Sequence, residues 1–199
     1  MSKRQIVLAS NNTGKIAEVT EYLDPLGWAV LPQSNWSIPS APEPHGTFLE
    51  NALSKARFVA QRTKGPVLSD DSGLCVSALG GAPGVDSRWY AGSEATDEQN
   101  VQKLLHVLSG VQTREAYFYC VLVYLESATD PAPKVWDGRW WGSITREQQG
   151  HGGFGYDPVF WVKDLQCVAA NLTRSQKNQL SHRGQALRSM VRYWEKERA

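Results

Sequence analysis

The sequence lacks long hydrophobic runs, paired cysteines and an excess of either charge. Its longest apolar run, Ala116 to Leu125, has ten residues, whereas a membrane-spanning helix needs roughly 20. The three cysteines are widely spaced and form no C-x-x-C pair, which argues against a disulfide framework and a structural zinc site. Lys and Arg number 21 against 20 Asp and Glu, so no global field attracts a polyanion. We expect a cytoplasmic protein with neither a membrane nor a nucleic-acid partner.

What the sequence does contain is enough apolar surface to fold alone. The chain has 199 residues, 41% of them hydrophobic, and eight tryptophans. A chain of this length fits one core, because single cores extend to roughly 250 residues. No internal repeat or linker composition divides it. We therefore predict a single domain over residues 1–199, either compact or built of two lobes that share a core.

The first 31 residues predict an α/β fold. Gln5 to Ala9 is an apolar run typical of a buried strand, and the polar run Ser10 to Gly14 follows it as a turn. Apolar residues then recur at helical spacing from Ile16 to Leu26, and a short strand is expected at Trp28 to Leu31. Strand, polar loop, helix and strand in this order are typical of α/β proteins.

Capping boxes and apolar patterns place the remaining main elements. Thr47 to Glu50 and Thr96 to Gln99 each match the box in which the Thr hydroxyl and the Glu or Gln side chain satisfy free amides reciprocally. Each predicts a helix, the first running to about Arg62. Residues 117–125 and 135–144 predict two neighbouring antiparallel strands, and apolar positions from 186 to 194 predict a final amphipathic helix.

An acidic pair follows a short apolar run and is a candidate metal site. Pro66 to Ser69 predicts a short strand, and we expect Asp70-Asp71-Ser72-Gly73 at its end, before a second apolar piece from Leu74 to Leu79. Mg²⁺ is typically held by one or two carboxylates with substrate phosphates and water. Adjacent side chains of an extended chain point oppositely, so one Asp would act directly. The alternative is a turn in which the Asp side chains bond nearby amides.

Two further segments are suited to phosphate and to a base. Ser10 to Lys15 lies between a strand and a helix N-terminus, where free amides favour an anion, although Ala9 and Ile16 exclude a Walker A loop. Gly150 to Pro158 contains G-x-G-x-x-G, but Pro158 opposes the helix that a dinucleotide fingerprint must open. Its glycines suit close approach to a flat ligand, with Phe154 or Tyr156 as a stacking face. An ordinary loop and a hairpin turn are the respective alternatives.

Isolated charged residues stay ambiguous at this stage. Lys177, His182 and Arg183 could pair with phosphate or base atoms, although solvated charges at a helix end are the commoner explanation. Glu43 lies in the proline-rich segment 32–46, which has no periodicity, and it could be a second carboxylate for a metal. Cys75 and Cys120 lie in apolar runs that would keep a thiol inert, which gives covalent catalysis little support.

Six segments together resemble the inosine triphosphate pyrophosphatase family, enzymes that remove non-standard purine nucleoside triphosphates such as dITP, ITP and XTP. They are Ser10-Asn11-Asn12-Thr13-Gly14-Lys15, Thr47-Phe48-x-Glu50-Asn51-Ala52-x-x-Lys55-Ala56, Asp70-Asp71-Ser72-Gly73-Leu74, Gly81-Ala82-Pro83-Gly84-Val85, Gly152-Gly153-Phe154-Gly155-Tyr156-Asp157-Pro158 and Ser181-His182-Arg183. The chain departs from the family where Trp89, His45, Gln148-Gln149 and Asn171 stand in place of Arg, Gly, Pro-Arg and Glu.

The resemblance implies a fold, a reaction and a set of site residues. The fold would be a two-lobed protomer around an elongated mixed β-sheet flanked by helices, with a cleft between the lobes, in a homodimer. The reaction would be Mg²⁺-dependent hydrolysis to a nucleoside monophosphate and pyrophosphate. Asp71 would be the catalytic base and a metal ligand, with Glu43 as the second ligand. The substrate would contact Ser10, Asn11, Asn12, Thr13, Gly14, Lys15, Ser72, Phe154, Gly155, Tyr156, Asp157, Lys177, His182 and Arg183.

Two other functions remain open from the sequence. The chain could be a sensor module that binds purine nucleotides without hydrolysing them. It could also bind single-stranded nucleic acid through the tryptophan-rich stretch 136–141, although the absence of a basic stripe opposes this function.

Overall fold

The structure is a computed structural model that describes residues 3–150 and 152–197. Within these residues the strands form one seven-stranded sheet in the order β2-β1-β3-β4-β5-β6-β7. The sheet is mixed, because β1 runs parallel to β2 and β3 whereas β6 runs antiparallel to β5 and β7. The strands are β1 (Arg4–Leu8), β2 (Trp28–Pro32), β3 (Val67–Val76), β4 (Glu115–Leu125), β5 (Lys134–Ile144), β6 (Phe160–Val162) and β7 (Cys167–Val168). A mixed sheet flanked by helices confirms the predicted α/β class.

The α-helices begin where the sequence supplies caps. They are α1 (Thr13–Leu23), α2 (Phe48–Thr63), α3 (Asp97–Val107), α4 (Arg174–Leu180) and α5 (His182–Lys196). The capping box predicted at Thr96 is present, with both hydrogen bonds to Gln99. The box predicted at Thr47 is only half formed: its hydroxyl accepts from the Glu50 amide but donates to the Glu50 carboxylate, which therefore does not reach the Thr47 amide. Helix α4, which the sequence analysis missed, has its own box at Thr173.

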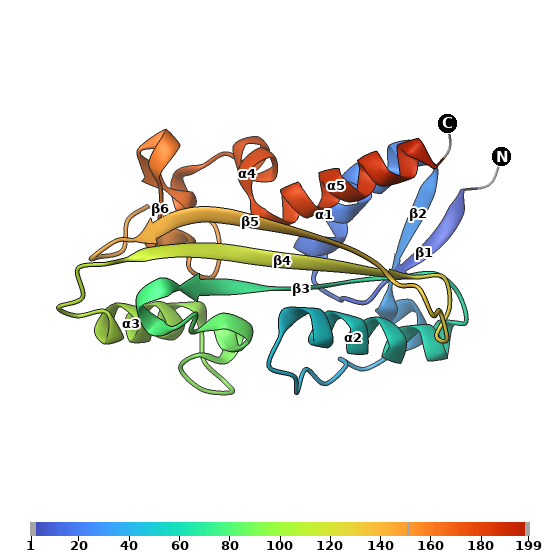
Figure 1. Ribbon diagram of the computed structural model, residues 1–199, viewed down its shortest axis with the longest axis horizontal. Helices are drawn as coiled ribbons and strands as arrows, with labels where there is room; N and C mark the ends of the chain where they lie inside the picture. Colours follow the sequence, from blue (N-terminus) through green and yellow to red (C-terminus); the bar gives the residue numbers. More distant parts are fainter. Residues whose placement is uncertain (1–2, 151, 198–199) are drawn as a thin grey trace. The chain divides into compact units, whose positions relative to one another are not determined.

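The chain divides into two compact units, each made of segments that are distant in sequence. Unit 1 contains residues 3–71, 120–138 and 183–197. Figure 1 shows α1 and α5 on one side of its strands and α2 on the other. Its main core joins apolar residues of α1 and α5 to the strands, including Leu23, Leu122 and Met190, all of them fully buried. Trp28, Tyr124 and Trp194 pack ring against ring, with centroids 5.3 to 6.4 Å apart.

Unit 2 contains the described residues of 72–119 and 139–182. Val101 and Leu104 of α3 and the following residue Leu108 pack into a core that also contains the aromatic side chains of Phe118 and Phe160. The tryptophan-rich stretch does not form a continuous exposed platform. Trp140 is 5% exposed in this core, whereas Trp141 is 59% exposed.

The acidic pair lies inside a strand, which corrects the prediction that it follows one. Strand β3 runs without a break from Val67 to Val76, so Asp70 and Asp71 occupy its fourth and fifth positions. The strand was predicted to end before the acidic pair because local sequence does not show which partners a carboxylate will find. In the structure Asp70 is 3% exposed and paired with cations, so the strand can continue through it. The segment after β2 also has a short 3₁₀ helix, Gln33–Trp36, where no regular structure was predicted.

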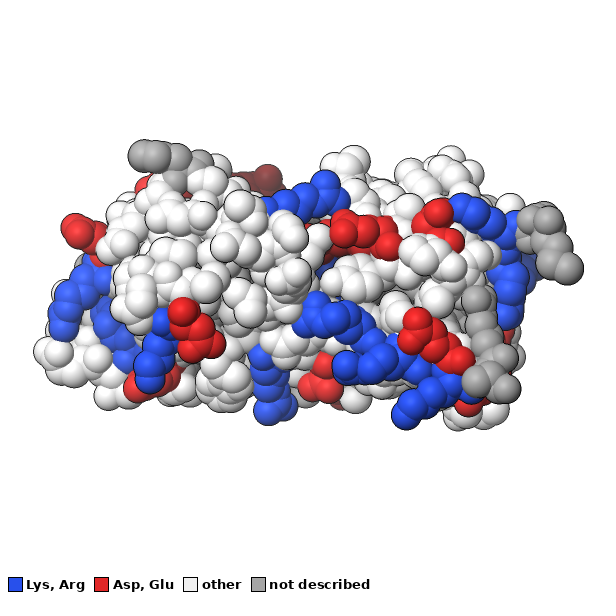
Figure 2. Space-filling view, turned by 90° about the horizontal axis from the view of Figure 1, so that it is seen from above, with Lys and Arg blue, Asp and Glu red and all other residues white. Residues whose placement is uncertain are grey.

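Two further observations concern the surface charge and the length of the helices. On the face drawn in Figure 2, Lys and Arg are intermixed with Asp and Glu, and no broad basic area covers it. Among the described residues, no helix is both long and apolar enough to cross a membrane.

Replacing a core residue tests the packing of unit 1. Leu122 is fully buried in β4, so we expect Leu122→Ala to lower the free energy of unfolding by about 2–5 kcal/mol, because it leaves a cavity. Chemical denaturation measures the loss. The control Val135→Ala changes a side chain that is 45% exposed and should cost less than about 1 kcal/mol. Equal losses in the two variants would contradict the described core.

Candidate active site

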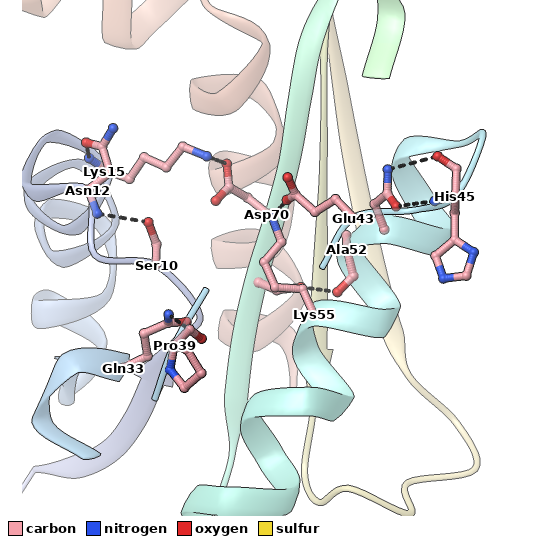
Figure 3. Close-up of polar contacts among 12 residues, drawn as sticks. Ser10, Asn12, Lys15, Gln33, Pro39, Glu43, His45, Ala52, Lys55 and Asp70 are labelled. Carbon is pink, nitrogen blue, oxygen red and sulfur yellow. Dashed lines mark hydrogen bonds and ion pairs between the residues drawn. The ribbon is translucent and has the colours of Figure 1, made fainter. Parts of the chain in front are cut away.

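The first loop bends tightly before α1, as the sequence predicts. The Ser10 hydroxyl accepts from the Asn12 amide at 3.1 Å, and the Asn12 side chain caps α1 by accepting from the Lys15 amide at 3.1 Å (Figure 3). These two amides are therefore already used by the protein itself. The Lys15 side chain is one turn into the helix and extends toward β3.

A buried ion cluster surrounds Asp70, and we call it the Asp70 cluster. The Lys15 ammonium lies 2.9 Å from an Asp70 carboxylate oxygen, and the Arg183 guanidinium lies 3.3 Å from the same oxygen. A second nitrogen of Arg183 contacts the Glu18 carboxylate at 3.0 Å. The cluster thus joins β3 to α1 and to the first turn of α5, all within unit 1.

The cations determine the charge of Asp70. Burial alone would raise the pKa of its carboxyl, but the nearby charges of Lys15 and Arg183 hold this pKa well below its usual range. The Arg183 guanidinium is also buried, yet the Asp70 and Glu18 carboxylates raise its pKa above the ordinary value. Asp70 is therefore an ionised structural partner, and it is not available as a neutral acid.

Lys55 of α2 lies among three carboxylates and forms the second charged group of unit 1. Its ammonium is paired with Glu43 (Figure 3). Burial lowers the pKa of Lys55, but the charges of Asp70, Glu43 and Asp71 together raise it above the ordinary value. Asp71 is half-buried and follows Asp70 directly in the strand. Asp71, the predicted catalytic base, and Glu43, the predicted second metal ligand, therefore both act on the Lys55 ammonium.

Buried amide side chains hold the segment that bears Glu43. Gln33 is 3% exposed and donates to the carbonyl oxygens of Ile38 and Pro39, at 3.4 Å each. Asn51 of α2 donates to the His45 carbonyl at 3.1 Å and accepts from the His45 amide at 2.9 Å (Figure 3). Lys55 and Asn51 were not chosen as site residues from the sequence. Both lie in the segment Glu50-Asn51-Ala52-x-x-Lys55, which carries part of the family resemblance and could have identified them.

The donor set fits a hard divalent cation such as Mg²⁺. Asp71 and Glu43 offer carboxylate oxygens, the ligands that Mg²⁺ prefers, and one or two of them suffice when substrate phosphates and water complete the coordination. Among the described residues, no group of three or more His, Cys, Asp or Glu could hold a metal by itself. An ion at this position would therefore depend on the substrate for part of its coordination shell.

The glycine-rich loop of unit 2 presents Phe154. We use this name for residues 150–158, of which His151 lies outside the described residues. Asp157 is 2% exposed, accepts from the Phe154 amide at 2.9 Å and forms an ion pair with Lys177. The Lys177 ammonium lies 4.1 Å from the centroid of the Phe154 ring, which is itself 62% exposed. No α-helix opens here; Asp157 begins a 3₁₀ turn of three residues.

The structure separates the two aromatic residues proposed for stacking. The Tyr156 ring is 5% exposed in the core of unit 2, and its hydroxyl donates to the Ser87 carbonyl at 2.8 Å. Burial also raises the pKa of the Tyr156 hydroxyl. The exposed ring of Phe154 is consequently the one that can stack on a ligand.

His182 and Arg183 are neighbours in sequence but have different surroundings. The His182 ring is 9% exposed and lies parallel to Phe118, with an interplanar angle of 13° and centroids 5.1 Å apart. His182, Lys177, Ser72 and the glycine-rich loop belong to unit 2, whereas Arg183 belongs to unit 1. The two side chains that begin α5 are thus buried groups with defined neighbours, and the description as solvated helix-end charges does not fit them.

The strand cysteines are unsuited to nucleophilic chemistry. Burial raises the pKa of Cys120 to about 12 and also raises the pKa of Cys75. Both thiols are at most 5% exposed.

Comparisons with known proteins place the chain in a family. The profile of the Ham1 family matches residues 6–193. A dITP/XTP pyrophosphatase of Idiomarina loihiensis is 51% identical over 96% of this chain and 98% of its own, and one of Nitrosomonas europaea is 50% identical over 94% and 92%. The solved structure of a HAM1 protein from Coxiella burnetii superimposes with a TM-score of 0.93 at 46% identity, covering 97% of this chain and 99% of that one. The chain therefore belongs to the Ham1 family.

Removing the charge of Asp70 tests the buried cluster. We expect Asp70→Asn to lower the free energy of unfolding by about 3–5 kcal/mol, because Arg183 and Lys15 lose their shared anion. The pKa of Asp70 is lower in the folded state than in the unfolded state. Its contribution is therefore complete above about pH 4 and is lost as the pH falls through the folded-state pKa. The stability difference between wild type and variant should shrink in acid.

Denaturant titrations at several pH values measure this difference. The matched control is Asp24→Asn, which removes an exposed partner of Lys3 and should cost about 0–1 kcal/mol. A cost for Asp70→Asn that matches the control, or that grows in acid, would refute the described role.

Proposed function

We propose that this protein hydrolyses non-standard purine nucleoside triphosphates, namely dITP, ITP and XTP, to the nucleoside monophosphate and pyrophosphate. Such a reaction would cleanse the nucleotide pool. The observation that supports it most is the identity of about 50%, over more than nine-tenths of the chain, to proteins named dITP/XTP pyrophosphatases. Two features of the separate units also support it: the charged groups of unit 1 suit phosphates and a cation, and the exposed ring of Phe154 in unit 2 suits a base.

The cleaved bond would be the one between the α phosphorus and the oxygen that bridges to the β phosphate. Asp71 would take a proton from a water molecule as the water oxygen attacks the α phosphorus. The bridging oxygen would leave with the β and γ phosphates as pyrophosphate. Lys15 and the amides of Asn11, Thr13 and Gly14 would bind the negative charge that accumulates on this leaving group, with Ser10, Asn12 and Ser72 as further contacts.

A bound Mg²⁺ would neutralise phosphate charge, with Asp71 and Glu43 as its protein ligands. The Lys55 ammonium, which is already paired with Glu43, would help to hold these carboxylates in position. Asp70 would hold Lys15 and Arg183 in place, because one of its carboxylate oxygens already contacts both cations.

Base selection would rely on donors and on stacking. The base would lie on Phe154, held by the loop residues Gly155, Tyr156 and Asp157. Lys177 can only donate hydrogen bonds, so it suits the keto oxygen at position six of hypoxanthine or xanthine and opposes the amino group of adenine. His182 and Arg183 would contribute further contacts to the purine nucleotide. Homodimerisation and a cytoplasmic location stay predictions of the sequence.

A substrate panel tests the reaction and its selectivity. With Mg²⁺ present, we expect release of pyrophosphate from dITP and XTP with a kcat/KM at least about a hundredfold above that for dATP, because a mismatched donor leaves buried polar groups unpaired. Chelation of the metal by EDTA should abolish release. Comparable rates on dITP and dATP would refute the selectivity, and release of phosphate without pyrophosphate would refute the site of cleavage.

The variant Asp71→Asn distinguishes an enzyme from a nucleotide sensor. An enzyme that uses Asp71 as its base should lose about two to four orders of magnitude in kcat. The control Asp164→Asn changes an exposed carboxylate of unit 2 and should keep wild-type kinetics. Nucleotide binding without turnover in the wild type, measured by calorimetry, would favour the sensor.

A further inference from the structure

Two carboxylates hold consecutive amides of the glycine-rich loop. Asp157, from the loop itself, accepts from the Phe154 amide at 2.9 Å. Asp97, which lies 58 residues before Gly155, accepts from the Gly155 amide at 2.6 Å. Asp97 is the first residue of α3 and was not among the site residues predicted from the sequence. All of these residues belong to unit 2.

The position of the Phe154 ring depends strongly on these backbone bonds. The ring is 62% exposed, so it is held by few contacts of its own beyond the Lys177 ammonium. The residues on either side are glycines with φ of +79° at Gly153 and +58° at Gly155. Glycine backbone has more conformations to lose than any other residue, so it needs external bonds to stay in one of them.

Helix α3 is a rigid support for one of these bonds. The helix face that begins with Asp97 continues through Val101 and Leu104, four and seven residues further on, and both are at most 1% exposed in the core of unit 2. A full capping box between Thr96 and Gln99 fixes its first turn. Because Asp97 follows Thr96 directly, the position of its carboxylate follows from the position of the helix. The bond to Gly155 is charge-assisted, which makes it stronger than a bond between neutral groups.

We propose that Asp97 is a positioning residue for base recognition. By fixing the amide of Gly155, it holds the Phe154 ring in the orientation that a purine base meets, and it makes no contact with the base itself. This role rests on the proposed function for the identity of the ligand. It predicts a defect in substrate binding that leaves the chemical step unchanged, because Asp97 does not act on the phosphates.

The test compares Asp97→Ala with Asp97→Asn and with Glu94→Ala, a nearby exposed carboxylate. Asp97→Ala should raise KM for dITP about tenfold and leave kcat within about twofold, since one charge-assisted hydrogen bond is lost. Asp97→Asn keeps an acceptor oxygen and should restore most of the affinity. Glu94→Ala should match the wild type. Thermal unfolding of each variant shows whether the helix itself was damaged.

A second measurement does not depend on activity. Hydrogen–deuterium exchange of a peptide that spans residues 152–158 should be faster in Asp97→Ala than in the wild type and in Glu94→Ala. Unchanged exchange would overturn the inference even if the enzyme is active. Faster exchange together with an unchanged KM would overturn the role in base recognition. If the wild type releases no pyrophosphate from any nucleotide, the proposed function fails, and the role in base recognition fails with it. The exchange result still decides whether Asp97 orders the loop.

Discussion

The buried carboxylate of Asp70 is the constraint on which much of unit 1 depends. Its two cations come from α1 and α5, so one side chain in the middle of β3 specifies how two helices lie on the sheet. A buried charge without partners would cost several kcal/mol, and this penalty excludes arrangements in which either helix is displaced. The same pairing explains why a strand can pass through two consecutive acidic residues.

Strand alternation then gives the two aspartates different surroundings. Asp70 is 3% exposed, whereas Asp71 is half-buried. The charges of Asp70, Glu43 and Asp71 all act on Lys55. Asp70 is thus bound in ion pairs that hold α1 and α5, whereas Asp71 stays partly accessible.

Local sequence patterns predicted most helices and strands, whereas contacts between residues distant in sequence determined the length of β3 and the support of the glycine-rich loop. Capping patterns at Thr47 and Thr96 placed two helices, since a capping side chain and its amide lie within three residues of each other, and the spacing of apolar residues placed the helix after the first loop. The continuity of β3 was missed because the cations that permit it come from residues 15 and 183. The Asp97 contact was missed for the same reason, because its partner is 58 residues away. The stacking residue could not be chosen until burial separated Phe154 from Tyr156.

Two departures from the resembled family lie next to the glycine-rich loop. Gln148 donates to the Glu98 carboxylate at 2.7 Å, which ties the approach to the loop to the first turn of α3. A Cβ atom on Gly150 would lie 2.2 Å from the Asn171 amide oxygen, so these two positions pack directly against each other. Both differences therefore affect how the loop is supported, whereas the Asp70 cluster retains the residues that the resemblance implies. Variation of this kind would alter the fit of a base more readily than the hydrolytic step.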